Sequence, residues 1–156
     1  MLILEILHKA KRISFNNNIH GKWVEGYYIY HIKRTPCVIG DCVKPEDEVH
    51  MIAYDGFSDW NMPRDIEQCI IDPETLCRYT GLEDRYKQKL WEHDIVTIAG
   101  EDGYFHLCWE EDRAAYVLEN ELENVVVTFD NYWAHEMERH GNIFDNPELM
   151  QTEYER

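Results

Sequence analysis

The sequence predicts a mainly β fold with little helix, and three observations carry this prediction. Aromatic and β-branched residues are concentrated in short runs, such as "GKWVEGYYIY" at 21–30. Asn, Gly, Asp and Pro residues, which favour turns, separate these runs. From residue 95 onward, runs and turns alternate in a short rhythm that is typical of successive hairpins in a small antiparallel barrel.

Four strands are predicted in the first half of the chain. They cover residues 2–14, 22–32, 48–54 and 66–71. The first two form a hairpin around the turn-forming sequence "FNNNIHG" at 15–21. The polar loop before the fourth strand contains Trp60, for which a buried core position is favoured over an exposed binding role. After the fourth strand Asp72 precedes Pro73, an arrangement typical of a short helical turn capped by aspartate.

The second half is also predicted to be rich in strands. They cover residues 95–98, 104–109, 114–118 and 123–129. Gly100 and Gly103 supply the first turn between them. Residues 130–140 are ambiguous, because Asp130 could cap a short helix that Gly141 would end.

Length and composition indicate a folded, soluble, intracellular protein. Of the 156 residues, 44% are hydrophobic and 13% aromatic, which is too much apolar surface for a disordered chain. No apolar run approaches the roughly 18 residues that span a bilayer. The 31 acidic and 15 basic residues give a net charge of -16, which repels nucleic acid and anionic membranes at long range.

The cysteines and histidines form no metal-binding pattern along the sequence, so no metal site is predicted. Five irregularly spaced cysteines indicate reduced thiols rather than a disulfide framework. Cys69, Cys77 and Cys108 lie beside strand formers and are interpreted as small buried apolar side chains. In "HEMERH", His135 and His140 are five residues apart and would point about 140° apart on a helix, unlike a protease zinc motif.

No catalytic or cofactor-binding arrangement stands out either. Ser14 and Ser58 lie outside any Gly-x-Ser-x-Gly elbow, and the eight glycines are scattered singly instead of forming a phosphate-binding loop. Neighbouring carboxylates, as in "WEEDR" at 109–113, are expected to be solvated turns. The sequence therefore predicts a protein that is not an enzyme and that binds no cofactor.

One long stretch, "IDPETLCRYTGLEDRYKQKLWEHDIV" at 71–96, is the most patterned part of the chain. Two shorter segments accompany it, "GKWVEGYYI" at 21–29 and "HGNIFDNPELM" at 140–150. Together and in this order, they resemble the motifs of the YopX family, small proteins of phages and prophages. The resemblance implies structural roles for ten signature residues: Pro73, Glu74, Thr75, Tyr79, Thr80, Gly81, Leu82, Asp94, Gly141 and Asn142.

The chain departs from the family pattern at three places within this stretch. Arg78 stands where glutamine is common, Tyr86-Lys87 where the family often has Asn-Gly, and His93 where it has glycine before Asp94. Bulky residues adopt positive φ only at a cost. A turn that depends on glycine is therefore expected to be opened or rebuilt here.

The resemblance also implies an architecture. It predicts a β-rich part over residues 1–78 and an SH3-like small barrel over residues 79–156, the two packed as one unit. No enzymatic activity and no cofactor are attached to the family, so it supplies no reaction.

The leading functional hypothesis is a non-enzymatic protein-interaction module of phage or prophage origin, which acts on an unidentified protein partner in the cytoplasm of a bacterial host. One alternative is an acidic decoy that imitates nucleic acid and occupies a host DNA-binding protein. A second is a weak nucleic-acid binder or a cryptic enzyme, supported only by the basic cluster Lys9, Lys11 and Arg12, which is more simply a solvated strand edge. No membrane partner is expected, and exposed strand edges leave homo-oligomers open.

Overall fold

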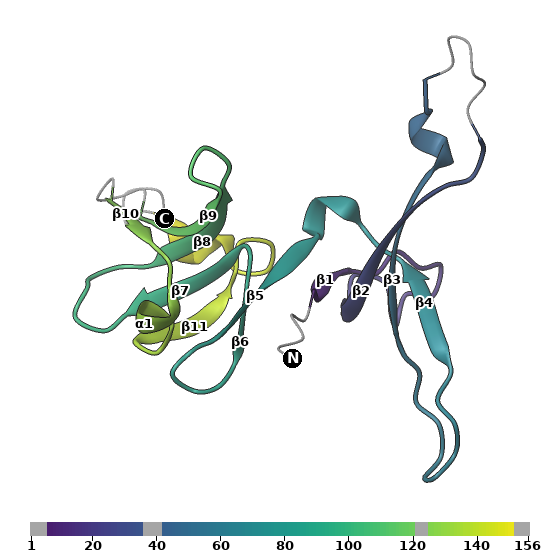
Figure 1. Ribbon diagram of the computed structural model, residues 1–156, viewed down its shortest axis with the longest axis horizontal. Coiled ribbons are helices and arrows are strands. Elements are labelled where there is room, and N and C mark those ends of the chain that lie inside the picture. The colour runs from purple at the N-terminus through teal and green to yellow at the C-terminus, as the bar shows by residue number, and fades with distance from the viewer. Residues whose placement is uncertain (1–5, 36–41, 121–124, 152–156) are drawn as a thin grey trace. The chain divides into compact units, whose positions relative to one another are not determined.

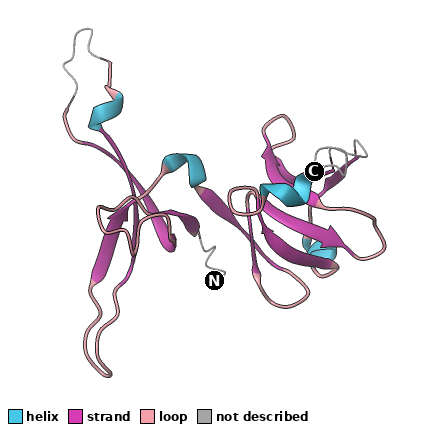
Figure 2. Cartoon of the chain, turned by 180° about the vertical axis from the view of Figure 1, so that it is seen from behind, coloured by secondary structure: helices cyan, strands magenta, loops and turns pink. Residues whose placement is uncertain are grey.

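Strands dominate the structure, a computed structural model that describes residues 6–35, 42–120 and 125–151 (Figures 1 and 2). The prediction of a mainly β fold with little helix is confirmed. The chain divides into two compact units, one formed by Ile6–Leu76 and the other beginning at Cys77. We call them the N-terminal unit and the C-terminal unit. Among the described residues, no helix is long and apolar enough to span a membrane.

Antiparallel strands build the N-terminal unit in the order β4-β3-β2-β1. Their bounds are β1 His8–Lys11, β2 Trp23–Ile32, β3 Glu48–Asp55 and β4 Ile66–Ile70, and the short 3-10 turns are η1 Pro45–Asp47 and η2 Pro73–Thr75. The predicted hairpin and the two further strands are present, although β1 is shorter than the predicted range 2–14, whose first residues lie outside the described part of the chain. Asp72 caps η2 as predicted, because its Oδ1 accepts a hydrogen bond from the N–H of Glu74 at 3.1 Å.

The core of the N-terminal unit lies on one face of this sheet. Alternate residues of a strand point to opposite faces, and the inward ones, Ala10, Val24 and Ile52, are buried together with Ile71. A bridge between Arg12 and Ile71 also joins the end of the first strand to the end of the fourth. On the opposite face, Tyr27 and Ile29 of β2 are exposed.

A five-stranded antiparallel sheet, in the order β10-β9-β8-β7-β11, forms most of the C-terminal unit. The bounds are β7 Asp94–Ile98, β8 Phe105–Glu110, β9 Ala115–Asn120, β10 Val125–Thr128 and β11 Met137–Asn142, and β5 Cys77–Glu83 pairs with β6 Lys89–Trp91 as an antiparallel hairpin outside this five-stranded sheet. The buried residues Leu90, Phe105, Leu107, Leu118 and Met137 belong to its core.

The small barrel predicted for this half is not closed. Strands β10 and β11 are the outer strands of the sheet, and no pairing joins them in the described residues. Instead, Leu82 and Leu90 of the β5–β6 hairpin belong to the core of the sheet. Packing of these side chains covers the core side of the five-stranded sheet, so this sheet does not need to close into a barrel by hydrogen bonds.

The segment 130–140 begins as a short helix and ends as a strand. Asp130 does accept a hydrogen bond from the N–H of Trp133 at 3.1 Å, but the helix it starts, α1, spans only Asn131–Ala134. The chain then enters β11, where the side chain of Met137 is buried and pairs in register with Ile98. Burial of this apolar side chain against β7 outweighs the local helix signal. The short 3-10 turn η3, Pro147–Met150, follows β11.

The tight turns at Lys87 and His93 keep the conformation that favours glycine. The φ angles are 65° at Lys87 and 69° at His93, both in the left-handed region. Neighbouring hydrogen bonds hold both turns: the N–H of Lys87 donates to the carbonyl of Asp84 at 3.0 Å, and that of His93 donates to the carbonyl of Leu107 at 2.7 Å. A local hydrogen bond at Lys87 and a tertiary one at His93 therefore retain the turns, although neither residue is glycine and the backbone is strained at both.

Replacing Lys87 with glycine is expected to stabilise the protein by about 1 kcal/mol. Lys87 is exposed and holds a left-handed conformation that costs roughly this much, whereas glycine adopts the same conformation without strain. Urea unfolding measures the change. Lys87→Ala is the matched control, since it removes the same charge and keeps the Cβ. An equal gain in both variants would mean that charge, not backbone strain, is responsible.

Candidate functional sites

Three signature residues, Pro73, Glu74 and Thr75, form the turn η2 in the N-terminal unit. The buried Thr75 hydroxyl donates to the carbonyl of Asp72 at 2.8 Å and accepts from the N–H of Lys11 at 2.9 Å. This turn therefore fixes the end of β1.

The next signature residues form the β5–β6 hairpin of the C-terminal unit. Tyr79 pairs with Trp91 across the hairpin, with ring centroids 5.3 Å apart, and Thr80 Oγ1 donates to the carbonyl of Leu90 at 2.8 Å. Gly81 has a φ of 84° at the irregular part of the ladder, where glycine avoids strain. The ring contact, the hydrogen bond and the glycine conformation all help to shape the hairpin.

Asp94, the eighth signature residue, lies in a buried carboxylate network. Its Oδ2 accepts hydrogen bonds from the N–H of Trp91 at 2.9 Å and from Nε of Arg139 at 2.7 Å. A second buried carboxylate, Asp84, accepts from the backbone N–H groups of Tyr86, Gln88 and Arg139. Arg139 on β11 thus connects two acidic residues of the patterned stretch.

Gly141 and Asn142, the last two signature residues, shape the end of β11. A Cβ at Gly141 would collide with the side chain of Asn146, so the close approach requires glycine. The buried Asn142 accepts hydrogen bonds from the N–H groups of Phe144 and Asp145, both at 3.0 Å. None of the ten signature residues contributes to a cluster of potential metal ligands in the described residues.

Exposed apolar side chains are concentrated in the N-terminal unit. All the large hydrophobic residues exposed in the described part of the chain belong to it, apart from Tyr86. Four of them, Tyr27, Ile29, Ile66 and Ile70, lie on the outer face of the sheet, as the strand pairing and the alternation of side chains show. We call these four residues the apolar face.

A groove borders the apolar face and continues its apolar character. Its volume is about 380 Å³, and Ile13, Val49 and Ile70 contribute to its lining. In the loop that joins β3 to β4, Trp60 is 90% exposed and Phe57 is 91% exposed. The expectation that Trp60 is a core residue is therefore wrong, because the loop extends beyond the sheet and offers it no apolar partner layer.

The acidic residues are distributed unequally between the two halves of the sequence. Residues 6–76 contain 8 basic and 11 acidic side chains, whereas residues 77–156 contain 7 basic and 19 acidic ones. The apolar face thus belongs to a unit whose positive and negative charges nearly balance. Most of the net negative charge lies in the C-terminal unit.

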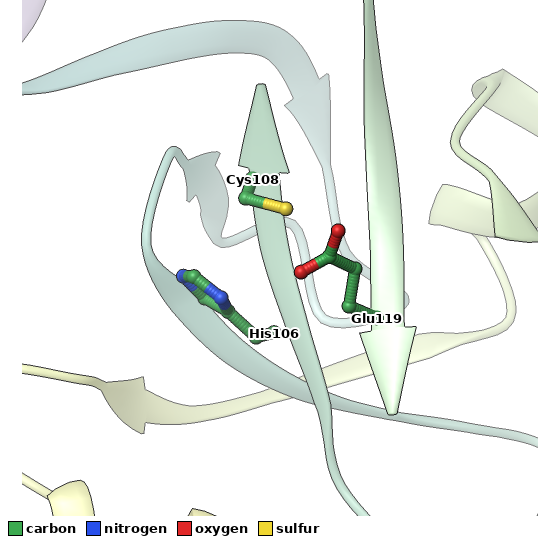
Figure 3. A group of neighbouring side chains, drawn as sticks. All are labelled: His106, Cys108 and Glu119. Atoms are coloured by element: carbon green, nitrogen blue, oxygen red, sulfur yellow. The ribbon is translucent and has the colours of Figure 1, made fainter. Parts of the chain in front are cut away.

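A different cluster lies in the C-terminal unit, on the two neighbouring strands β8 and β9 (Figure 3). The potential ligand atoms of His106, Cys108 and Glu119 all lie within 4.8 Å of one another. His106 is paired directly with Glu119, and Cys108 follows two residues later on the same side of β8. All three side chains are half-buried.

The environment of Cys108 is acidic and partly dry. Burial raises the pKa of its thiol to about 12, and the charge and hydrogen bonding of Glu119 add to this, followed by the charges of Glu110 and Glu92. The thiol is thus protonated at neutral pH in the absence of a cation. The interpretation of Cys108 as an apolar core residue is wrong, since its neighbours are ionisable; buried Cys77 does match it.

His93 supports the cluster from the turn before β7. Its Nδ1 lies 3.1 Å from Nε2 of His106, and the two rings stack with centroids 5.4 Å apart and an interplanar angle of 19°. Phe144 also packs against His93 in an edge-to-face arrangement, with ring centroids 5.5 Å apart. The strained backbone of His93 therefore places a ring against one member of the cluster.

Comparison with protein-family models decides the family. The model described as YopX protein matches residues 45–151, which is more than half of the chain. The chain belongs to the YopX family. None of the curated proteins compared with the chain matches it. The YopX match includes the whole patterned stretch 71–96 and the segment 140–150, so the family resemblance drawn from these motifs is confirmed.

Sequence reasoning missed both the apolar face and the His106, Cys108 and Glu119 cluster. The cluster joins two strands, so no spacing within one segment reveals it; the only signal is the alternation His-x-Cys at 106–108 on a predicted strand. The apolar face was missed for a related reason. A strand with apolar residues on both sides does not show in its sequence which side meets the core.

Proposed function

We propose that this YopX chain is a non-enzymatic protein-interaction module, which binds a positively charged protein partner through the apolar face. The supporting observation is the exposure of Tyr27, Ile29, Ile66 and Ile70 on one side of a sheet. Contiguous exposed apolar surface of this kind marks interaction sites, and the groove beside Ile70 can accept an apolar side chain.

The charge of the chain supports a partner with an excess of positive charge. With a net charge of -16, the chain attracts basic proteins and repels a second copy of itself. Most of that charge lies in residues 77–156, so it leaves the apolar face itself accessible to apolar contacts. Long-range attraction then speeds encounter, while the apolar face supplies most of the affinity.

The edge strand β4 favours the same role. Four of its five residues are exposed, and β4 is the outer strand of the sheet of the N-terminal unit. Exposed sheet edges can accept an extended segment of another protein by backbone hydrogen bonding. The partner would thus meet both an apolar surface and a strand edge.

The proposal is tested by capture from a bacterial lysate with the immobilised chain, followed by titration with each purified captured protein. The double variant Ile66→Ser with Ile70→Ser is expected to weaken binding of a basic partner by at least about tenfold. Tyr86→Ser is the matched control, because it also removes an exposed large apolar side chain but lies in the C-terminal unit. It should bind as the unmodified chain does.

Two results would overturn the proposal in different ways. If the double variant keeps full affinity and binding disappears at moderate salt, the chain acts as an acidic decoy, since charge alone then carries the interaction. If the same double variant loses a light-scattering dimer instead of a heterologous partner, the apolar face joins two copies of the chain.

A further inference from the structure

We propose that His106, Cys108 and Glu119 form a binding site for a zinc ion. The three residues offer an imidazole nitrogen, a sulfur and a carboxylate oxygen, which are the three ligand types of protein zinc sites. Their potential ligand atoms already lie within 4.8 Å of one another (Figure 3). Ligands bound to one zinc ion at roughly 2.0–2.3 Å lie about 3–4 Å apart, so small side-chain rotations complete the site.

The strand ladder fixes the three side chains on a rigid support. His106 and Glu119 face each other across β8 and β9, and Cys108 adjoins them on the same side. Between His106 and Cys108, Leu107 points the opposite way, and both it and its partner Leu118 are fully buried in the core. Sites on packed strands hold ligand geometry better than sites on loops.

His93 acts as a positioning residue for His106. Metal-binding histidines usually hydrogen-bond through the ring nitrogen that does not touch the metal, and the 3.1 Å approach of His93 Nδ1 to His106 Nε2 provides such a contact. The backbone of His93 adopts a φ of 69°, which a histidine does at a cost. If the Cys108 thiol only formed a hydrogen bond with Glu119 and no metal bound, neither the strained backbone of His93 nor the stacking of His93 on His106 would be explained.

Glu119 supplies the negative charge of the cluster, because Glu92 and Glu110 nearby are paired with Arg78 and Arg113, each at 3.0 Å. Zinc binding releases the thiol proton of Cys108 to solvent and forms a zinc–thiolate bond. Three protein ligands leave a fourth position for water.

The site is independent of the proposed interaction, because it lies in the C-terminal unit and uses none of the residues of the apolar face. If zinc binds, it cross-links β8 to β9 and stabilises the native state by mass action. The role of the metal would then be structural, unless the fourth position is taken by a substrate or by a partner side chain.

Titration of the full chain with Zn²⁺ alone, and with Co²⁺ as a spectroscopic probe, tests the proposal. One ion should bind per chain, and Co²⁺ should produce near-ultraviolet thiolate-to-cobalt absorption. Cys108→Ser should abolish this absorption and weaken Zn²⁺ binding by more than about 100-fold, the upper range for changes outside the ligand set. Cys42→Ser is the matched control, because Cys42 is exposed in the N-terminal unit and should not alter either signal.

Protection of the unmodified chain gives a second test that needs no variant. Zn²⁺ should slow alkylation of Cys108 and leave that of Cys42 unchanged, as mass spectrometry of the labelled peptides shows. Absence of thiolate absorption in the unmodified chain, or its persistence in Cys108→Ser, would overturn the proposal. Equal alkylation of Cys108 with and without Zn²⁺ would do the same.

The positioning role of His93 has its own readout. His93→Ala should weaken Zn²⁺ binding by about 10–100-fold while the thiolate absorption of bound Co²⁺ remains, because the ligands are unchanged. A merely structural histidine would shift the urea midpoint of the metal-free chain and leave its Zn²⁺ affinity as it was.

Discussion

Replacing Asp94 with alanine is expected to lower the free energy of unfolding by about 3–5 kcal/mol, the range for removing one partner of a buried ion pair. The carboxylate is fully buried and accepts hydrogen bonds from Nε of Arg139 at 2.7 Å and from the N–H of Trp91 at 2.9 Å. Alanine leaves both donors without their acceptor. A guanidinium whose side chain is only about a quarter exposed then loses its counter-charge.

Urea or thermal unfolding measures this loss, and Asp102→Ala is the matched control. Asp102 is exposed in the turn between β7 and β8, so its replacement removes the same charge without removing a buried acceptor. A double-mutant cycle with Arg139→Met should give a coupling energy of about 2 kcal/mol between the two side chains. A loss below about 1 kcal/mol in Asp94→Ala would show that water replaces the ion pair freely.

The second large effect is expected for Asp84→Ala, at about 3–4 kcal/mol, because three hydrogen bonds to one buried carboxylate are lost together. Oδ1 of Asp84 accepts from the N–H groups of Tyr86 and Gln88 at 2.8 and 2.9 Å, and Oδ2 accepts from that of Arg139 at 3.2 Å. The first two bonds hold the strained turn at Lys87, and the third attaches this turn to β11.

Asp84→Asn separates the two parts of that effect. Its amide oxygen can still accept from the turn, whereas its NH₂ group would face the N–H of Arg139, so a smaller loss than with alanine is expected. Asp112→Ala, at an exposed position of the β8–β9 turn, controls for the lost charge. Equal stability of Asp84→Ala and Asp112→Ala in urea would contradict the role given to this carboxylate.

The two carboxylates give the patterned stretch a structural role. Asp84 and Asp94 lie ten residues apart in the sequence, on either side of β6, and both accept hydrogen bonds from Arg139. Between them are the two non-glycine turns at Lys87 and His93. The pattern of the stretch therefore reflects a hydrogen-bonded network in the folded protein. A sequence comparison detects the pattern of residues, but it does not reveal the hydrogen-bonding geometry that explains it.

Local chemistry made several elements predictable from the sequence. The strands β2, β3 and β4 follow runs of aromatic and β-branched residues, and the Asp72 cap follows from an aspartate before Pro73. Such signals depend on neighbours in the chain, so they survive without knowledge of the fold. The segment 130–140 stayed ambiguous in the sequence, because the pairing of Met137 with a distant partner, Ile98, cannot be read from neighbouring residues.

What the sequence by itself determined is the strand-rich fold, the YopX family and the large negative charge, because each depends on residue types and their order. Tertiary structure alone decided which sheet face is exposed, which acceptors receive Arg139, and that Cys108 meets His106 and Glu119. These results depend on pairing between strands that are far apart in the sequence. A shift of one residue in that register would move every side chain to the other face.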